Sequence, residues 1–156
     1  MDLNVNAFSL YAKDWALLTA GNKDAYNTMT IGWGGIGTMW GKPAVTVYVR
    51  TSRHTLGFVD KNETFTLSWF DDSYKKDLGI LGKESGRDGD KVAKTSLTPK
   101  FLEDGVTFEQ ANKTLVCKKM YRHEMDLDAM SEDLREKWYS TDTVHVMYIA
   151  EVVDIL

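Results

Sequence analysis

Apolar side chains along this chain come in short runs, many of them rich in β-branched residues or alternating with polar ones. The clearest case is Phe65–Trp69, where Phe65, Leu67 and Trp69 alternate with polar residues and would share one face of a strand. Comparable strand character is found at residues 15–20, 26–30, 45–50, 65–69, 106–108 with 115–121, and 144–156. The pattern therefore predicts about six strands.

Helical periodicity is confined to short segments. A helix is expected over His54–Asp60, with Ser52 or the threonine before it as the N-cap. A second helix is expected after the acidic cluster Asp71–Ser73, and a helical turn at Lys91–Ser96. Residues 126–137 contain helix formers and charges, and we expect this helix to pack against the body of the protein or against a partner subunit.

The length and composition favour a single domain. The 156 residues are 43% hydrophobic and 27% charged, which is ordinary for a globular protein with a real core. We find no internal repeat, low-complexity segment or linker. We therefore expect one domain over residues 1–156, mainly β, built as a small and mostly antiparallel β-barrel with short helices.

Several classes of protein lack support in the sequence. A net charge of -4 argues against broad binding of nucleic acid or anionic membranes. No signal peptide or membrane-spanning run is evident, so a soluble cytoplasmic protein is expected. The single cysteine, Cys117, excludes an internal disulfide, and the three histidines His54, His123 and His145 lack metal-ligand spacing. Motifs of P-loop, dinucleotide-binding and nucleophile-elbow enzymes are also missing.

The segment 32–37 is too rich in glycine for a helix. Glycine is needed where a strand bends or bulges, and equally where a ligand lies close to the backbone. Trp33 and Trp40 would place large apolar surfaces beside that space. The sequence alone leaves the structural and the ligand-binding interpretations about equal.

A basic turn follows the strand that ends near Arg50. Residues 50–55 read RTSRHT and supply two arginines and several hydroxyl groups. A helix starting here would add free backbone N–H groups, and the combination suits a phosphate group. The alternative is a capped helix with two solvated arginines, and local physics alone somewhat favours that alternative.

The order of the motifs along the chain adds a resemblance to these observations. The chain contains N-x-M-T from Asn27, W-G-x-x-G from Trp33, W-G-x-P from Trp40, VRxSRxT over residues 49–55 and NxxFTLS from Asn62. It continues with LGxxSGRDxDKV over residues 81–92 and ends with a D-x-x-H motif before YIAEV. In this order the motifs resemble the flavin reductase-like family with the FMN-binding split-barrel fold, over nearly the whole chain.

The resemblance implies roles for particular residues. The flavin ring would be lined by Asn27, Met29, Thr30, Trp33 and Gly34. The FMN phosphate would be held by the basic turn, through Arg50, Ser52, Arg53 and Thr55, with Ser85, Gly86 and Lys91 near the ribityl-phosphate end. His145 would lie at the flavin face where a nicotinamide docks, as the candidate catalytic residue.

The resemblance also implies an activity and partners. We expect non-covalently bound FMN, NAD(P)H as a co-substrate and a homodimer with the flavin near the subunit interface. We also expect electron transfer to an acceptor, for which a protein is one candidate. The alternative is a flavoredoxin-type electron-transfer protein without direct nicotinamide activity. A binding module without flavin is the third interpretation. Three positions depart from the family pattern, namely Thr51, His54 and Ala150, and none removes a hydroxyl or a cation from the expected phosphate site.

Overall fold

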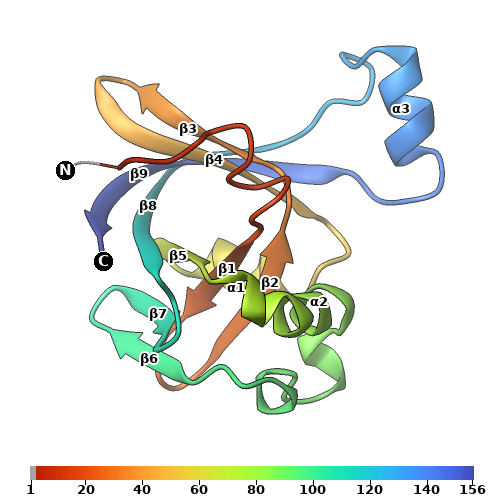
Figure 1. Cartoon of the computed structure of the whole chain (residues 1–156). Coiled ribbons are helices and arrows are strands. Elements are labelled where there is room, and N and C mark those ends of the chain that lie inside the picture. Colours follow the sequence, from red (N-terminus) through yellow and green to blue (C-terminus); the bar gives the residue numbers. More distant parts are fainter. Residues whose placement is uncertain (1–2) are drawn as a thin grey trace.

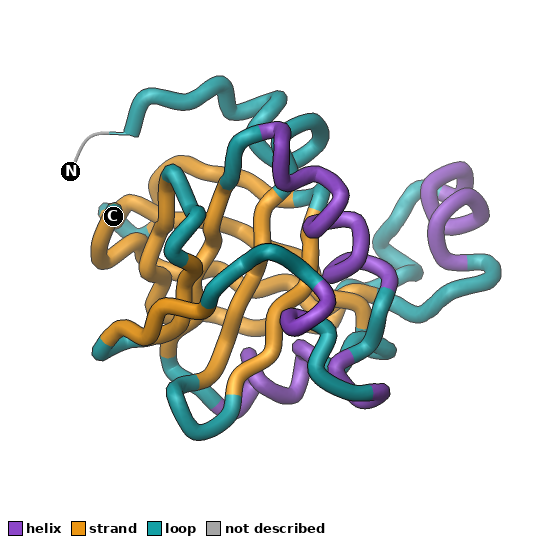
Figure 2. The backbone as a smooth tube through the Cα atoms, turned by 60° about the horizontal axis from the view of Figure 1, so that its bottom comes forward, coloured by secondary structure: helices purple, strands orange, loops and turns teal. Residues whose placement is uncertain are grey.

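A seven-stranded antiparallel sheet curls into the barrel that forms the body of the structure (Figures 1 and 2). The computed structural model describes residues 3–156. In sheet order the strands are β2 (Tyr26–Ile31), β1 (Ala16–Gly21), β5 (Thr64–Trp69), β8 (Lys113–Glu124), β9 (His145–Ile155), β4 (Lys42–Arg50) and β3 (Gly34–Met39). Strands β6 (Pro99–Leu102) and β7 (Gly105–Phe108) form a separate two-stranded sheet. The expected mainly β, antiparallel barrel with short helices is confirmed.

Strand β6 was not expected from the sequence, and β3 was only one of the two interpretations of the glycine-rich segment. Strand β3 is glycine-rich and has little strand propensity of its own, but it pairs with β4 from Gly34 opposite Val47 to Met39 opposite Lys42. The connecting turn is Trp40–Gly41, and both residues have positive φ, at 52° and 72°. Two successive positive φ values are typical of the tight hairpin turn that matches the twist of paired strands.

The barrel interior holds the main hydrophobic core, to which every strand of the large sheet except β3 contributes a buried residue. Alternation explains this directly, since Val45, Val47 and Val49 of β4 are all buried in this core and share one face of the strand. Tyr148 on the neighbouring β9 is also fully buried. A second cluster of buried residues lies beneath α2 and includes Leu78, Leu81 and Phe108.

Short helices cover one end of the barrel (Figure 2). Helix α1 spans Thr55–Lys61 and α2 spans Lys75–Lys83, with single 3₁₀ turns at Asp72–Tyr74, Gly86–Asp88 and Val92–Lys94. The expected side-chain cap of the first helix is wrong, because its N-cap residue is His54 and no side chain caps it. The hydroxyl groups of the basic turn are therefore not used for capping α1.

A long connection between β8 and β9 leaves the barrel and carries α3 (Glu132–Tyr139) away from the body (Figure 1). We call residues 125–144 the arm. The helix starts later than expected, because residues 126–131 form a loop with a turn at residues 128–129 before it. None of the α3 residues is buried, so the arm gains its position from a few contacts near its base. Within residues 3–156, no helix has the length and apolar character needed to cross a bilayer.

Candidate functional site

Two adjoining cavities lie at the end of the barrel where β2, β4 and the start of β9 meet the basic turn. The first, the central cleft, has a volume of about 220 Å³ and the second, the cationic pocket, about 90 Å³. Arg53 lines both, so the two cavities adjoin at this cation.

The structure brings almost all of the expected site residues together around these cavities. Those of the central cleft are Met29, Thr30, Trp33, Arg50, Arg53 and His145. Those of the cationic pocket are Asn27, Ser52, Arg53, Thr55, Ser85, Gly86 and Lys91. The exception is Gly34, which lines a neighbouring cavity described below.

The cationic pocket is built around the C-terminal end of α2. The Lys91 ammonium donates hydrogen bonds to the carbonyl oxygens of Leu81 at 2.9 Å and Glu84 at 3.0 Å. The Arg53 guanidinium donates to the carbonyl oxygen of Gly82 at 2.9 Å. Both cations therefore satisfy carbonyl groups that the helix end leaves without partners, and they do so while lining the pocket.

Burial makes these cations responsive to an anion. Lys91 is only 4% exposed, and burial, reinforced by the nearby Arg53 charge and opposed by Glu84, lowers its pKa to about 8. Burial also lowers the pKa of Arg53, against a smaller opposite effect of Asp142. An anion in the pocket would favour the charged form of both groups.

Close packing fixes the polar wall opposite the cations. The Asn27 side-chain amide donates to the Thr55 hydroxyl at 2.8 Å. Gly86 lies so close that an added Cβ would be 2.2 Å from the Asn27 Oδ1 atom, so only glycine fits there. The Arg87 guanidinium donates to the Ser52 carbonyl at 3.0 Å and ties the loop after α2 to the basic turn.

At the other end of the site, Arg50 and His145 are cross-strand partners on β4 and β9. The Tyr139 hydroxyl lies 2.8 Å from His145 Nδ1. Burial, with a smaller effect of the Arg50 charge, lowers the pKa of His145 to about 4, although Asp142 acts in the opposite direction. His145 is therefore neutral at pH 7 and serves as a hydrogen-bonding group in the wall rather than as a cation.

Three residues of this region were not predicted as site residues, Tyr48, Tyr139 and Trp138. The sequence held a signal for Tyr48, because it shares one strand face with Arg50, and both line the central cleft. Trp138, interpreted from sequence as core or interface, contacts Trp33 at a ring-centroid distance of 4.9 Å. The contact of Trp138 with Trp33 joins distant parts of the chain and carries no local signal, whereas Tyr139 meets His145 only six residues away.

The glycine-rich segment behaves differently from the expected ligand surface. An added Cβ on Gly34 would lie 2.6 Å from the Tyr11 ring, so this glycine makes room for an aromatic side chain of the protein itself. Trp40 lies at the β3–β4 hairpin tip, 57% exposed, with its ring 6.4 Å from the Tyr121 ring. It does not line the cleft. Within this segment, only Gly32 and Trp33 line the central cleft.

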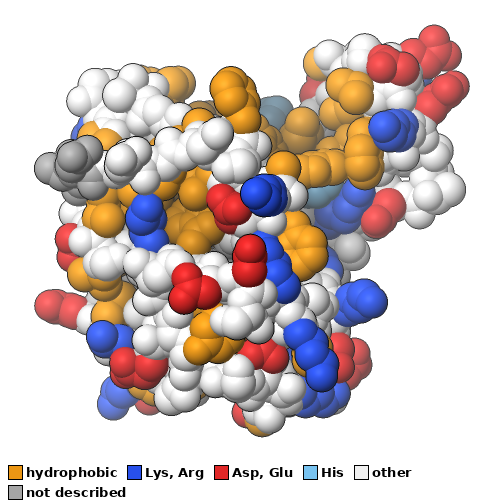
Figure 3. Space-filling model, in the orientation of Figure 1, with side chains coloured by type: hydrophobic (Ala, Val, Ile, Leu, Met, Phe, Trp, Pro, Cys, Tyr) orange, Lys and Arg blue, Asp and Glu red, His pale blue; other side chains and the backbone are white. Residues whose placement is uncertain are grey.

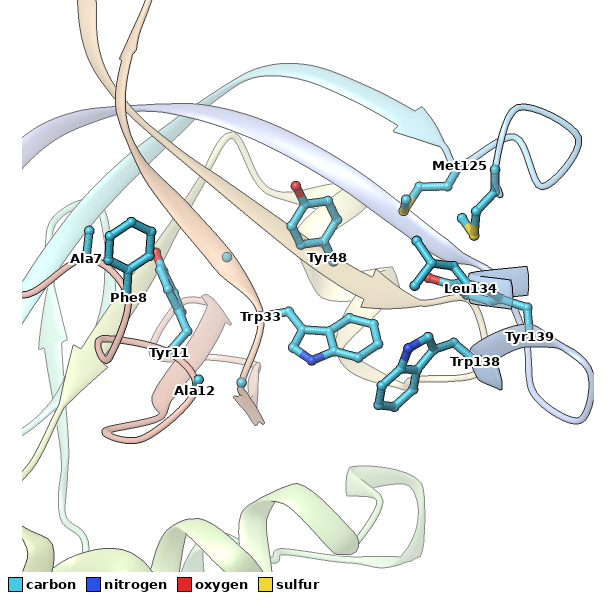
Figure 4. Close-up of a pocket in the computed structure, with 13 residues that line it drawn as sticks. Ala7, Phe8, Tyr11, Ala12, Trp33, Tyr48, Met125, Leu134, Trp138 and Tyr139 are labelled. Atoms are coloured by element: carbon cyan, nitrogen blue, oxygen red, sulfur yellow. The ribbon is translucent and has the colours of Figure 1, made fainter. Parts of the chain in front are cut away.

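A larger cavity adjoins the cleft, between the N-terminal segment and the arm (Figure 4). We call it the aromatic cavity; its volume is about 490 Å³. Its walls are Ala7, Phe8, Tyr11, Ala12, Gly32, Trp33, Gly34, Tyr48, Met125, Met130, Leu134, Trp138 and Tyr139. In the space-filling view, hydrophobic side chains gather in the notch where the arm leaves the barrel (Figure 3).

The fold is a small antiparallel barrel with a cation-ended cleft, and comparison with known proteins gives the family. The family model described as "Flavin reductase like domain" matches residues 8–156. The chain therefore belongs to the flavin reductase-like family. A search of curated proteins gave no match.

Solved structures share the fold over the whole chain. Flavoredoxin from Methanosarcina acetivorans is 19% identical with a TM-score of 0.72, covering 100% of this chain and 74% of that one. An FMN-binding protein from Thermus thermophilus, solved with bound 1-cyclohex-2-enone, gives 19% identity, a TM-score of 0.72 and coverages of 100% and 76%. An NADH:FAD oxidoreductase from Streptomyces globisporus C-1027 gives 14% identity, a TM-score of 0.68 and coverages of 92% and 74%. At these identities the likeness establishes the split-barrel fold.

The residues present fit FMN as the cofactor. A phosphate needs cations and hydrogen-bond donors, and the cationic pocket offers Arg53, Arg87 and the buried Lys91 against the single carboxylate of Glu84. The adjoining cleft is lined by Met29, Trp33 and other residues that suit a flat ring. One site thus joins a wall suited to a ring with a pocket suited to a phosphate.

Proposed function

We propose that the protein binds FMN non-covalently, with the phosphate in the cationic pocket and the flavin ring in the central cleft. The observation that carries the proposal is the position of Lys91 and Arg53. Both are cations held by protein carbonyl groups at the end of the cleft, where a phosphate tail would lie if the ring filled the cleft. Bound flavin would supply the redox chemistry, while the protein orients and tunes it.

We further propose that NAD(P)H reduces the flavin and that the electrons pass to an acceptor, so the protein acts as a flavin reductase. Membership of the family and the likeness to an NADH:FAD oxidoreductase support this activity. His145 is the residue we assign to the nicotinamide side of the cleft. Being neutral and hydrogen-bonded to Tyr139, it would act by orienting the bound ring rather than by charge.

A second candidate function is electron transfer without direct nicotinamide activity, as in a flavoredoxin. The aromatic cavity favours it, because none of the residues that line this opening beside the cleft is charged. The two phosphates of a dinucleotide would find no cation there. The likeness to a flavoredoxin points in the same direction.

We propose that the functional form is a homodimer with flavin near the subunit interface. Several large apolar side chains are exposed on the side of the hairpin and the arm, among them Trp33, Trp40, Tyr121 and Trp138. Exposed apolar surface of this kind commonly marks an interaction site. The site residues described above come from one chain, and a partner would cover the open side of the cleft.

Two measurements test these proposals in order. The visible spectrum of the purified protein, before and after incubation with FMN, shows whether flavin binds; a colourless protein after incubation would refute the central proposal. Anaerobic stopped-flow mixing of the FMN-loaded protein with NADH or NADPH then tests the activity. Rapid bleaching of the flavin supports the reductase, and no bleaching with either nucleotide supports the electron carrier.

The variant His145→Ala tests the assigned role of that residue. We expect it to slow flavin reduction by the nicotinamide more than it weakens FMN binding. If the reduction rate and the FMN affinity are both unchanged, His145 is a structural histidine of β9.

A further inference from the structure

The aromatic cavity shares a wall with the central cleft. Gly32, Trp33 and Tyr48 line both spaces, and the Trp33 ring lies 5.1 Å from the His145 ring inside the cleft. A molecule in the aromatic cavity would therefore lie next to whatever fills the cleft. The shared residues would place two such molecules within one layer of side chains of each other.

The size and chemistry of the cavity suit a small neutral molecule. Its volume of about 490 Å³ falls within the range of roughly 300–1,000 Å³ that is typical of small-molecule sites. None of its lining residues is charged. Trp33 and Trp138 meet edge to face, with 88° between their planes, and present flat surfaces, while Met125 and Met130 can adapt to ligands of different outline.

Side chains from two separate parts of the chain face each other across the aromatic cavity. The N-terminal segment contributes Phe8 and Tyr11, and the arm contributes Leu134 and Trp138, with the Trp33 and Tyr48 side chains between them (Figure 4). Facing walls of this kind can hold a planar ligand between them.

From these observations we infer that the aromatic cavity is the binding site of the oxidising substrate, a neutral, planar, conjugated carbonyl compound of the quinone class. The inference rests on the proposed function, because the electrons come from the flavin. In the overall reaction the quinone gains two electrons and two protons and becomes a hydroquinone. NAD(P)H supplies both electrons and one proton as a hydride and is oxidised to NAD(P)⁺, and solvent supplies the second proton.

The test measures binding separately from turnover. Isothermal titration calorimetry of 1,4-naphthoquinone into the oxidised protein, with and without FMN, needs no redox chemistry. We expect saturable binding that is weaker for the anionic 1,4-naphthoquinone-2-sulfonate, because the cavity holds no cation to pair with a sulfonate.

Two variants on α3 locate the site. Leu134→Asp puts a carboxylate into the lining, and because Leu134 is 46% exposed the change leaves the core intact. We expect at least about a tenfold loss of naphthoquinone affinity. Arg135→Ala is the matched control, since it changes the net charge by the same amount on the next residue, outside the lining, and its affinity should equal that of the wild type.

The outcomes separate this inference from the proposed function. Absent naphthoquinone binding, or equal affinities of the wild type and Leu134→Asp, would overturn the inference even if the flavin is bound and reduced by NAD(P)H. If naphthoquinone binds as expected but no FMN binds, the proposed function fails while the cavity remains a site for planar apolar ligands. If Leu134→Asp converts a dimer to a monomer by light scattering and naphthoquinone does not bind, the cavity is instead a subunit interface.

Discussion

Replacing Arg53 by alanine gives the sharpest test of phosphate recognition, because FMN and riboflavin differ only at the phosphate. If the guanidinium meets the phosphate, Arg53→Ala removes a charge-assisted hydrogen bond worth about 1.5–3 kcal/mol. That energy corresponds to roughly a tenfold to hundredfold loss of FMN affinity. Riboflavin has no phosphate, so its affinity should barely change, and the preference of the protein for FMN should shrink by the same factor.

The structure also sets the cost to folding. Arg53 donates one hydrogen bond to the Gly82 carbonyl oxygen at 2.9 Å, and losing it should cost about 1 kcal/mol. Lys91 still holds the neighbouring carbonyl groups of Leu81 and Glu84, so the end of α2 should stay in place. Riboflavin binding therefore serves as an internal control for the integrity of the variant.

Quenching of flavin fluorescence on binding gives both dissociation constants in one assay. Arg135→Ala is the matched control, because Arg135 is an arginine of α3 that pairs with Asp128 at 3.8 Å and lines neither site cavity. Equal losses for FMN and riboflavin would show that Arg53 supports the fold rather than the phosphate. No loss for either ligand would move the phosphate toward Arg87 and Lys91.

The other predictions concern pH, packing and assembly. FMN affinity should fall as pH rises through about 8, where Lys91 loses its proton, because the phosphate binds the charged lysine more tightly than the neutral one. Riboflavin affinity should not change over this pH range, and equal pH profiles for the two ligands would contradict a role of Lys91 in phosphate binding. In the flavin-free protein the His145 pKa is about 4 against an ordinary 6.5, so as pH falls from about 6.5 to about 4 the unfolded chain takes up a proton before the folded protein does, and the folded state loses stability. The melting temperature of His145→Gln should fall less over this pH range than that of the wild type, and an equal fall would show that His145 is not the cause. Gly86→Ala should lower the free energy of unfolding by roughly 1–3 kcal/mol, because the added Cβ would clash with Asn27. Gly79→Ala, in open space on α2, should instead stabilise the protein by up to about 1 kcal/mol, and similar effects of the two variants in thermal unfolding would refute the packing argument. Light scattering with FMN present should give the mass of a dimer, and a monomer that still binds FMN tightly would refute the proposed assembly.

Parts of the site that are formed by neighbouring residues of the sequence could be predicted from the sequence. The basic turn and the loop around Gly86 are each a single continuous stretch of sequence, so the residue types in each and their order can be recognised without a structure. The strand β4 is also visible, because its valines alternate toward the core. The same alternation places Tyr48 and Arg50 on the opposite face, so Tyr48 could have been predicted from the sequence as a site residue.

Other features depend on tertiary contacts that no local pattern records. Strand β3 exists because β4 pairs with it, and its Gly34 accommodates the Tyr11 ring of a segment more than twenty residues earlier in the chain. Trp40 is at the hairpin tip with φ of 52°, a conformation that non-glycine residues rarely adopt. Its position depends on strand register, so composition alone wrongly suggested that Trp40 lines the central cleft.

The arm is joined to the cleft through Arg50, and this link connects the two parts of the proposed function. The Arg50 guanidinium donates to the Thr143 carbonyl oxygen at 2.5 Å and to the Trp138 carbonyl oxygen at 3.3 Å, and its Nε atom lies 3.3 Å from the Asp142 carboxylate. The same residue lines the central cleft, while Trp138 lines the aromatic cavity. Since the exposed α3 has no buried residues of its own, these bonds at its base set where the arm wall of the cavity stands. The residue that forms part of the cleft wall therefore also positions the cavity in which we place the acceptor.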